Sequence, residues 1–243
     1  MASRISLKLV FLAATVCMTC HSTARALDPR KPLSQYTHTI WQTDSGLPQN
    51  TVHRIIQAHD GYIWLATDGG LVRFDGIEFT VFDNKNTPAI KSNQIRDLSE
   101  DSQGNLWLST PQGLIREKNN EFTAFTAADG LSTGAVLSTF GDRSGTIWIV
   151  TTGGLNSYRD GKFTQYNSQN GLASDSIETL IEDRQGSIWI GSSDGLTRFK
   201  DGVFTNYKDL AGTRTSVRVL MEDTKGRIWI GTPAGLYALS SGT

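Results

Sequence analysis

The amino-acid sequence predicts an all-β fold, a β-propeller with five visible four-stranded blades of about 41 residues each. Two observations lead to this prediction. One sequence pattern recurs five times, and each copy carries a tryptophan at the same place. Each copy also divides into four short apolar runs separated by glycine and aspartate turns, as in a small antiparallel sheet. The five tryptophans are Trp64, Trp107, Trp148, Trp189 and Trp229.

The fourth copy shows the expected elements most clearly. Its strands are predicted over residues 176–182, 187–192, 196–200 and 203–207. A turn is expected from Asp183 to Gly186, because aspartate can bond backbone amides and glycine can take a positive φ. The pair Asp201-Gly202 suits a tight hairpin between the last two strands.

The repeated tryptophans and turn aspartates are interpreted as scaffold. A flat ring on the second strand can fill the wedge between neighbouring blades, so the tryptophans are expected in the core and not in a ligand-binding cage. The aspartates occupy a fixed place in the turn before each tryptophan, which favours a structural role over acid-base chemistry. These aspartates are Asp101, Asp142, Asp183 and Asp223.

The N-terminal segment is typical of a secretory signal peptide, predicted over residues 1–26. Basic Arg4 and Lys8 precede the apolar run 9–20, and Ala24-Arg-Ala26 offers a cleavage site. An uncleaved membrane anchor is the alternative, but a membrane span needs about 20 apolar residues and this run is shorter. Both cysteines lie in the removed part, so the mature chain is expected to have no disulfide. Residues 27–35 are predicted as a short linker and residues 36–243 as the propeller, in the periplasm or secreted.

The balance of charge excludes some classes of partner. The formal net charge is -1, and no Lys/Arg-rich run is present. Nucleic acid and anionic membrane surfaces are therefore poor candidates as partners. No metal and no cofactor is expected.

The two ends of the repeat region look complementary. Trp41 precedes Gly46 by the spacing at which Phe125 precedes Gly130, so residues 38–42 are predicted as a displaced fourth strand. The fifth repeat has three predicted strands and stops inside a hairpin at residues 241–243. An N-terminal strand that completes the last blade is a common way to close a propeller. Two hypotheses stay open: five blades that close on themselves, or the first part of a longer array.

The sequence resembles the two-component regulator propeller repeats, and the resemblance covers about residues 36 to 240. It is carried by an opening segment and by the first repeat together. These are Trp41-Gln-Thr-Asp-Ser-Gly-Leu-Pro-Gln-Asn50, Gly61-Tyr-Ile-Trp-Leu-Ala-Thr67, Gly70-Leu-Val-Arg-Phe-Asp-Gly76 and Phe79.

This resemblance implies an extracytoplasmic input module of sensor histidine kinases, hybrid sensor kinases or diguanylate cyclases. It also implies a small-molecule ligand, commonly of carbohydrate origin, and a membrane-bound signalling output; a homodimer is left open. The sequence has no phospho-acceptor helix, no ATP-binding box and no Gly-Gly-Asp-Glu-Phe motif. The chain is therefore not expected to be an enzyme, and a kinase or cyclase activity would belong to a further part.

The repeats of such proteins differ most in sequence at positions that bind ligands. We therefore look for the ligand site at positions where the residue varies among the five copies. Aligned on the tryptophans, two variable positions on the first strand are predicted to line a central funnel. A mixed polar set there suits a polar or anionic ligand such as an acidic sugar, and the alternative is a network of ion pairs. The predicted funnel residues are His53, Arg54, Arg96, Asp97, Glu178 and Arg218.

A second candidate site is the rim formed by the loops that enter each blade and by the turns between second and third strands. Five polar residues lie in these loops and turns, and they are weaker candidates. They are Asn50, Asp68, Asn93, Gln112 and Asp194.

Two rival function classes stay open. A streptogramin-lyase-like or glycan-active propeller enzyme would need a histidine and a carboxylate facing each other, and His53 with Glu178 is the one pairing to test. A protein-binding scaffold is the other, and a broad apolar rim would favour it over a narrow polar funnel.

Overall fold

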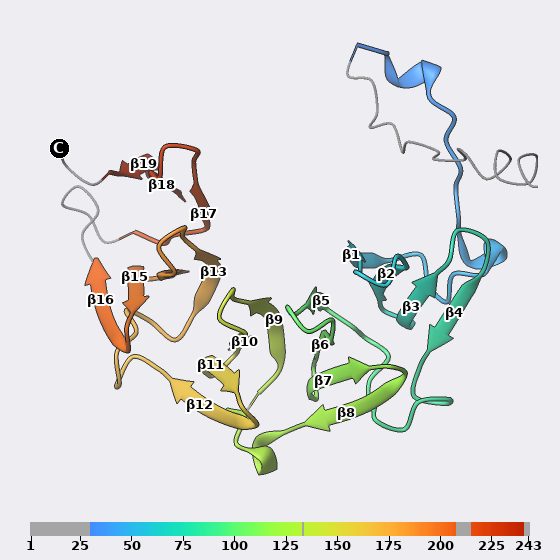
Figure 1. The fold of residues 1–243 in the computed structure, drawn as a ribbon, viewed down its shortest axis with the longest axis horizontal. Helices are drawn as coiled ribbons and strands as arrows, with labels where there is room; N and C mark the ends of the chain where they lie inside the picture. The colour runs from blue at the N-terminus through green and yellow to red at the C-terminus, as the bar shows by residue number, and fades with distance from the viewer. Residues whose placement is uncertain (1–29, 133, 208–214, 241–243) are drawn as a thin grey trace, which may run out of the picture. The chain divides into compact units, whose positions relative to one another are not determined.

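The computed structural model describes residues 30–132, 134–207 and 215–240, and the chain divides into two compact units, Met1–Ile40 and Trp41–Thr243. The predicted signal peptide lies outside the described residues. The described part of the first unit holds one short 3-10 helix, η1 (Leu33–Gln35). Every described strand belongs to the second unit (Figure 1).

The second unit contains five antiparallel sheets in its described residues, and in each sheet consecutive strands are hydrogen-bonded neighbours (Figure 1). The first sheet is β1 (Val52–Gln57), β2 (Ile63–Thr67), β3 (Gly70–Phe74) and β4 (Phe79–Phe82). The second is β5 (Asp97–Glu100), β6 (Leu106–Thr110), β7 (Gly113–Lys118) and β8 (Glu121–Phe125). The third is β9 (Val136–Gly141), β10 (Ile147–Thr151), β11 (Gly154–Arg159) and β12 (Lys162–Tyr166).

The fourth and fifth sheets continue the series. The fourth is β13 (Ile177–Glu182), β14 (Ile188–Ser192), β15 (Gly195–Lys200) and β16 (Val203–Tyr207). The fifth has three strands, β17 (Val219–Glu222), β18 (Ile228–Thr232) and β19 (Gly235–Leu239). Two 3-10 helices, η2 (Thr43–Ser45) and η3 (Ala127–Asp129), lie in loops that lead into the first and third sheets. The all-β prediction with four strands per repeat, and three visible strands in the fifth, is confirmed.

The hairpins follow from local sequence. Asp201 and Gly202 both have positive φ, 50° and 81°, as the tight turn predicted between β15 and β16 requires. Asp160 and Gly161 repeat this geometry between β11 and β12, with φ values of 49° and 80°. An aspartate tolerates this backbone better than most side chains do, and glycine carries no Cβ that would clash.

The predicted displaced strand over residues 38–42 is wrong, because these residues form no strand. The Trp41 ring packs edge-on against two rings of the first sheet instead. Its ring centroid lies 5.2 Å from that of Phe74 and 6.4 Å from that of Phe79. Aromatic contact with β3 and β4 thus takes the place of the backbone pairing that the repeat spacing predicted.

A recurring hydrogen bond ties four of the five tryptophans to the turn that precedes their strand. The carboxylate of the turn aspartate accepts from the indole Nε1–H six residues later, at 2.8 Å in the second sheet and 2.9 Å in the third. The fourth and fifth sheets repeat this bond at 2.8 and 2.9 Å. The other carboxylate oxygen accepts backbone N–H groups within the turn, as Asp183 does from Gln185 and Ser187. The structural interpretation of these aspartates is confirmed.

The first sheet departs from this pattern. Ala58 stands where the other four sheets have the aspartate, and the turn keeps the same backbone bonds, from Ala58 N–H to Tyr62 and from Gly61 N–H to Ala58. The Nε1–H of Trp64 is buried and has no hydrogen-bond partner among the described residues. A buried donor without a partner costs about 1–3 kcal/mol.

Consecutive sheets pack face to face through these tryptophans. Trp148 and Leu155 of the third sheet form one apolar cluster with Ile188 and Ile190 of the fourth. Trp189 and Leu196 continue the series against the fifth sheet. Trp64, Trp107, Trp148 and Trp189 are 2, 2, 3 and 7 % exposed. The prediction of core residues is confirmed for these four, whereas the fifth tryptophan, Trp229, is only partly buried.

In each sheet, a leucine follows the glycine that begins the third strand. The exposed fraction of this leucine shows whether a neighbouring sheet packs over it. This side chain is fully buried, at 0 % exposure, in four sheets, as Leu71, Leu114, Leu155 and Leu196. The same position in the fifth sheet is Leu236, which is 68 % exposed. Burial of this leucine therefore depends on the presence of a neighbouring sheet.

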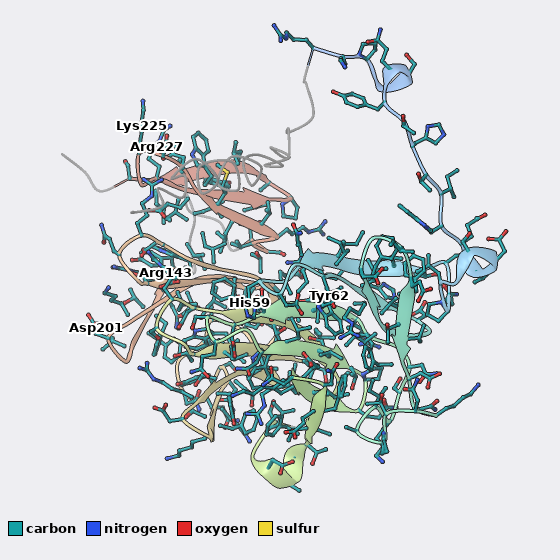
Figure 2. All side chains as sticks on the ribbon, turned by 45° about the vertical axis from the view of Figure 1, so that its right-hand side comes forward. His59, Tyr62, Arg143, Asp201, Lys225 and Arg227 are labelled. Atoms are coloured by element: carbon teal, nitrogen blue, oxygen red, sulfur yellow. The ribbon has the colours of Figure 1, made fainter. Side chains whose placement is uncertain are left out.

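Polar clasps join the turns of neighbouring sheets. In each contact, one residue directly follows the position of the turn aspartate. Its backbone N–H and its side chain both bond a glutamate at the end of the first strand of the next sheet. Arg143, one of these residues, is labelled in Figure 2. Arg143 bonds Glu182 in this way, with its backbone N at 2.9 Å and its Nε at 3.0 Å from one carboxylate oxygen. Arg184 bonds Glu222 similarly, with its backbone N at 2.9 Å.

His59 makes the corresponding clasp between the first and second sheets. Its Nδ1 lies 2.5 Å from Oε1 of Glu100, and its backbone N–H bonds both carboxylate oxygens at 3.1 Å. The hydrogen bond to Glu100, and then its charge, raise the pKa of His59 from 6.5. This clasp is thus the one among the three whose cation is a histidine, which loses its charge as pH rises.

Supplying the missing aspartate in the first sheet is expected to stabilise the protein. Ala58→Asp places a carboxylate where the turn already has the required backbone bonds, so it can accept from Trp64 and add about 1 kcal/mol to the free energy of unfolding. Urea unfolding followed by tryptophan fluorescence measures the change. The reverse substitution, Asp142→Ala in the third sheet, is the matched control and should lower stability by about 1–3 kcal/mol. A lower midpoint for Ala58→Asp would contradict this account.

The histidine clasp is expected to weaken as pH rises. Because folding raises the pKa of His59, its contribution is complete below the unfolded value, 6.5, and is lost as pH rises through the folded value. Urea midpoints of the wild type and of His59→Gln should therefore differ more at about pH 6 than at about pH 8.5. His38→Gln provides the control for general histidine titration. An equal difference at both pH values would show that protonated His59 does not stabilise this interface.

Candidate functional site

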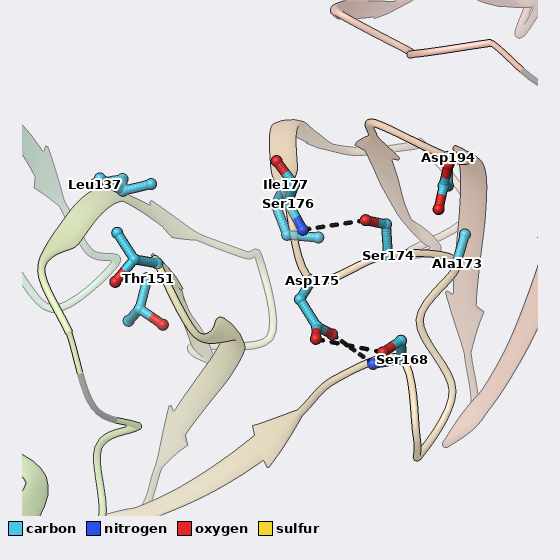
Figure 3. A pocket seen from close by; sticks show the side chains of 10 residues that line it. Leu137, Thr151, Ser168, Ala173, Ser174, Asp175, Ser176, Ile177 and Asp194 are labelled. Carbon is cyan, nitrogen blue, oxygen red and sulfur yellow. Dashed lines mark hydrogen bonds between the residues drawn. The ribbon is translucent and has the colours of Figure 1, made fainter.

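A cavity of about 500 Å³ lies between the third and fourth sheets (Figure 3). It opens among the loops that enter the fourth sheet and the turns between second and third strands, which is the predicted rim. The third sheet contributes Leu137 and Thr151, and the segment 173–177 faces them across the opening (Figure 3). The lining residues are Leu137, Thr151, Thr152, Ser168, Ala173, Ser174, Asp175, Ser176, Ile177 and Asp194.

The two strand turns at the cavity are held by the same local bonds. The hydroxyl of Thr151 donates to the carbonyl of Gly154 at 3.1 Å and accepts from the N–H of Gly153 at 3.2 Å. The hydroxyl of Ser192 donates to the carbonyl of Gly195 at 3.0 Å in the fourth sheet. Each turn therefore has a fixed base, and its variable tip residue, Thr152 in the third sheet, is presented at the cavity.

The loop that enters the fourth sheet is held by its own side chains. Asp175 accepts from the backbone N–H of Ser168 at 2.6 Å and from its hydroxyl at 3.3 Å (Figure 3). Ser174 accepts from the N–H of Ser176 at 3.2 Å and bonds the hydroxyl of Ser193 at 2.9 Å. The loop is thus tied both to itself and to the adjacent turn. A site of this kind is largely preformed before a ligand arrives.

Some polar groups at the cavity remain free to meet a ligand. Asp175 is occupied in holding its loop, whereas the carboxylate of Asp194 makes no hydrogen bond or ion pair with any described residue. The hydroxyl groups of Thr152 and Ser176 are likewise without a side-chain bond in the described part of the chain. These three groups combine two hydroxyls with one acceptor-only carboxylate.

The charge of the lining defines which ligands it can take. Two carboxylates line the cavity, and no lysine, arginine or histidine is among its lining residues. Leu137, Ala173 and Ile177 add apolar surface beside them. An anionic ligand would be repelled, whereas a ligand rich in hydroxyl groups could donate to the carboxylates and place its carbon face on the apolar side chains.

The five predicted rim residues make different contacts in the structure. Asp194 lies at the cavity. Asn50 accepts from the N–H of Thr43 at 3.0 Å, and Asn93 accepts from that of Asn84 at 2.9 Å, so both hold loops. Asp68 accepts hydrogen bonds from His53 at 2.8 Å and from Gln94 at 3.1 Å. The backbone N–H of Gln112 donates to the hydroxyl of Thr110.

The six predicted funnel residues are partly paired. Arg54 and Asp97 form an ion pair at 3.6 Å across the first two sheets, and His53 pairs with Asp68 outside the set. Burial is the largest effect on Asp97, and it raises the pKa of this carboxyl although Thr139 donates a backbone hydrogen bond to it. The side chains of Arg96, Glu178 and Arg218 make no bond or ion pair within the described ranges. A ligand site at the funnel stays a prediction.

Sequence reasoning missed most of the cavity lining. The segment Ala173-Ser-Asp-Ser176 differs from the loops that enter the other sheets, and this local disagreement among the copies was a signal that could have found it. Thr152 carried no such signal, because its role follows from the neighbouring sheet and not from its own repeat.

Two arrangements that an enzyme could use are a metal centre and a pairing of His53 with Glu178. No group of three or more His, Cys, Asp or Glu side chains in them could hold a metal ion. His53 bonds Asp68, and no described contact joins it to Glu178, the pairing that a lyase was expected to need. No helix found in the same residues is long and apolar enough to cross a membrane.

The fold and the site together define an all-β protein of the propeller class, built from tandem blades with a polar cavity between two of them. A family model described as two component regulator propeller matches residues 46–69, 89–112, 171–194 and 212–234. These segments run from the loop that enters a sheet to the turn after its second strand. Four segments of the chain thus match repeats of the two-component regulator propeller family.

Solved structures show the same fold. The chain is 20 % identical to the extracellular domain of one hybrid two-component system from B. thetaiotaomicron, with a TM-score of 0.64 over 76 % of this chain and 27 % of that one. A second such domain from the same organism gives 21 % identity and a TM-score of 0.63, over 79 % and 29 %. The chain therefore spans less than a third of the length of these two relatives.

A propeller enzyme is similar as well. Virginiamycin B lyase from Staphylococcus aureus is 15 % identical, with a TM-score of 0.59 over 79 % of this chain and 70 % of that one. At these identities the likenesses establish the fold alone. No curated protein matches the chain in sequence.

Proposed function

We propose that this chain is the extracytoplasmic ligand-sensing part of a two-component-type signalling system, and that it binds a neutral, hydroxyl-rich ligand of the carbohydrate class between its third and fourth sheets. The family repeats and the extracellular origin of similar domains support the first part. The unpartnered carboxylate of Asp194 in the cavity is the observation that carries the second. The predicted signal peptide supports a periplasmic or secreted location.

The ligand class follows from the lining chemistry. Sugar hydroxyls can donate to a carboxylate and both donate to and accept from serine and threonine hydroxyls, which are the groups that this cavity offers. A hydrogen bond to a charged group contributes about 1.5–3 kcal/mol, so Asp194 is expected to supply much of the specificity. The acidic sugar favoured by the funnel residues does not suit this lining, because Asp175 and Asp194 would repel its carboxylate.

The signalling step rests on where the cavity lies. Its walls come from two neighbouring sheets, so a bound ligand would favour one packing of these sheets over others. The shift would reach a membrane-bound output such as a histidine kinase or a diguanylate cyclase. This chain would contribute binding and no catalytic step.

Isothermal titration calorimetry with maltotriose, cellotriose and trigalacturonate tests the proposed site. At least one neutral trisaccharide is expected to bind, and trigalacturonate is expected to bind at least about tenfold more weakly because of the two carboxylates. Asp194→Asn should weaken binding of the neutral ligand by about tenfold, which is the loss of one hydrogen bond to a charged group.

Gln112→Asn is the matched control, since Gln112 occupies the same turn position in the second sheet and does not line this cavity. It should leave the affinity unchanged. Tighter binding of trigalacturonate than of either neutral sugar, or equal effects of Asp194→Asn and Gln112→Asn, would contradict the proposed site.

A further inference from the structure

A second, smaller cavity of about 170 Å³ lies between the second and third sheets. It is formed by the turn before β6, by β6 and β7, and by the β11–β12 hairpin of the next sheet. Its volume is several times the roughly 30 Å³ that one water molecule occupies in the liquid. The polar side chains that matter for its chemistry are Asp101, Asn105, Arg116, Arg159 and Asp160.

Arg116 is the unusual group in this cavity. It lies on β7 opposite Trp107 on β6, and its guanidinium carbon is 5.7 Å from the ring centroid of Phe125. The Nε atom of Arg116 is buried and has no hydrogen-bond partner, and no described carboxylate pairs with this guanidinium. A partly buried cation without a partner is costly, and it attracts an anion.

The other repeats show what this position ordinarily does. Arg198 of the fourth sheet lies opposite Trp189 in the same way, and its Nε and Nη2 both donate to the hydroxyl of Ser187, at 3.0 and 2.8 Å. Arg73 of the first sheet donates to the side-chain oxygen of Asn120 at 3.3 Å. The arginine of the second sheet therefore differs from its equivalents in having no acceptor.

Asn105 adds a second unpartnered atom to the same cavity. The residue is 5 % exposed, and its Nδ2 donates to Asp101 at 2.7 Å, whereas its Oδ1 is buried and has no partner in the described part of the chain. Asn105 occupies the position that Ser187 takes in the fourth sheet, two residues before the tryptophan. Arg116 and Asn105, which both line this cavity, thus carry a buried donor, Nε, and a buried acceptor, Oδ1, that no described residue uses.

The remaining charged groups at the cavity are already engaged. Asp101 accepts from Asn105 and from the indole of Trp107, and these bonds outweigh the effect of burial and leave its pKa below the usual value. Arg159 lies 3.7 Å from Asp160 and donates to Ser144 at 3.2 Å. Neither carboxylate neutralises Arg116, so an external anion would meet a free guanidinium.

We propose that this cavity is a separate binding site for a small carboxylate that carries a hydroxyl group. The carboxylate would accept from the guanidinium of Arg116, and the adjacent hydroxyl would donate to Oδ1 of Asn105. Arginine suits this role because its planar fork matches the geometry of a carboxylate. The site is independent of the hydroxyl-rich cavity between the third and fourth sheets, and it takes a ligand of the opposite character.

NMR titration of the full chain with sodium glycolate tests the proposal, because glycolate is the smallest anion with both groups. The Nε–H signal of Arg116 and the indole signal of Trp107 are expected to shift and to saturate. Sodium propionate, which lacks the hydroxyl, should bind at least about threefold more weakly, and ethylene glycol, which lacks the charge, should not saturate.

Two matched variants identify the residue. Arg116→Gln should weaken glycolate binding by at least about tenfold, while Arg198→Gln, the same change at the equivalent site of the fourth sheet, should leave it unchanged. Arg116→Lys keeps the charge, and it should retain weaker binding if the fork is used. The indole signals report whether each variant is folded.

Three results would overturn the assignment. Equal weakening by Arg116→Gln and Arg198→Gln would show binding to general surface charge. Equal affinity for propionate and glycolate would remove the role of Asn105. An absence of saturable shifts at Arg116 and Trp107 in the folded wild type would mean that the cavity takes no such anion.

Discussion

The hydrogen bond between the turn aspartate and the tryptophan of the following strand is the interaction on which the other features depend. It fixes a large ring at the face where two sheets meet, and it satisfies the one polar atom that the ring would otherwise bury. Four sheets form this bond, from Asp101, Asp142, Asp183 and Asp223. Because the ring is held from its own turn, these four sheets place a tryptophan at the same position of the second strand.

A constant interface leaves the loops free to differ. The turns after the second strands keep one hydroxyl-to-carbonyl bond at their base, as in Thr151 and Ser192, and change only at the tip. Both cavities described above lie where two such sheets meet, one with carboxylates and hydroxyls and the other with an unpaired guanidinium. The same scaffold thus supports two sites of different chemistry at neighbouring interfaces.

The sequence was sufficient to predict the elements within each repeat, but it was insufficient to predict the contacts between repeats. The strands of the fourth repeat, the hairpin at Asp201 and the buried tryptophans follow from local pattern, and all were predictable. The strand expected over residues 38–42 was wrong, because spacing cannot reveal that Trp41 finds Phe74 and Phe79 to pack against.

The same distinction between local features and contacts across repeats applies to the candidate sites. Asp194 was predicted from its variable turn, whereas the pairing of Arg54 with Asp97 and the isolation of Arg116 both depend on which side chain the adjacent sheet supplies. Such information is absent from a single repeat. Comparison of the five copies shows only which positions vary. The three-dimensional structure is needed to show which of these variable side chains contact one another.

The exposed Leu236 has a consequence for how the protein moves. The fifth sheet is covered where it packs against Trp189 and Leu196 and is open on the side of Leu236, so its separation uncovers one apolar interface, whereas a sheet covered on both sides would lose two. Amide protons should therefore exchange fastest there, and more slowly in sheets flanked on both sides. The third and fourth sheets, where Leu155 and Leu196 are fully buried, are flanked on both sides, so the cavity between them is expected in a slowly exchanging part of the molecule.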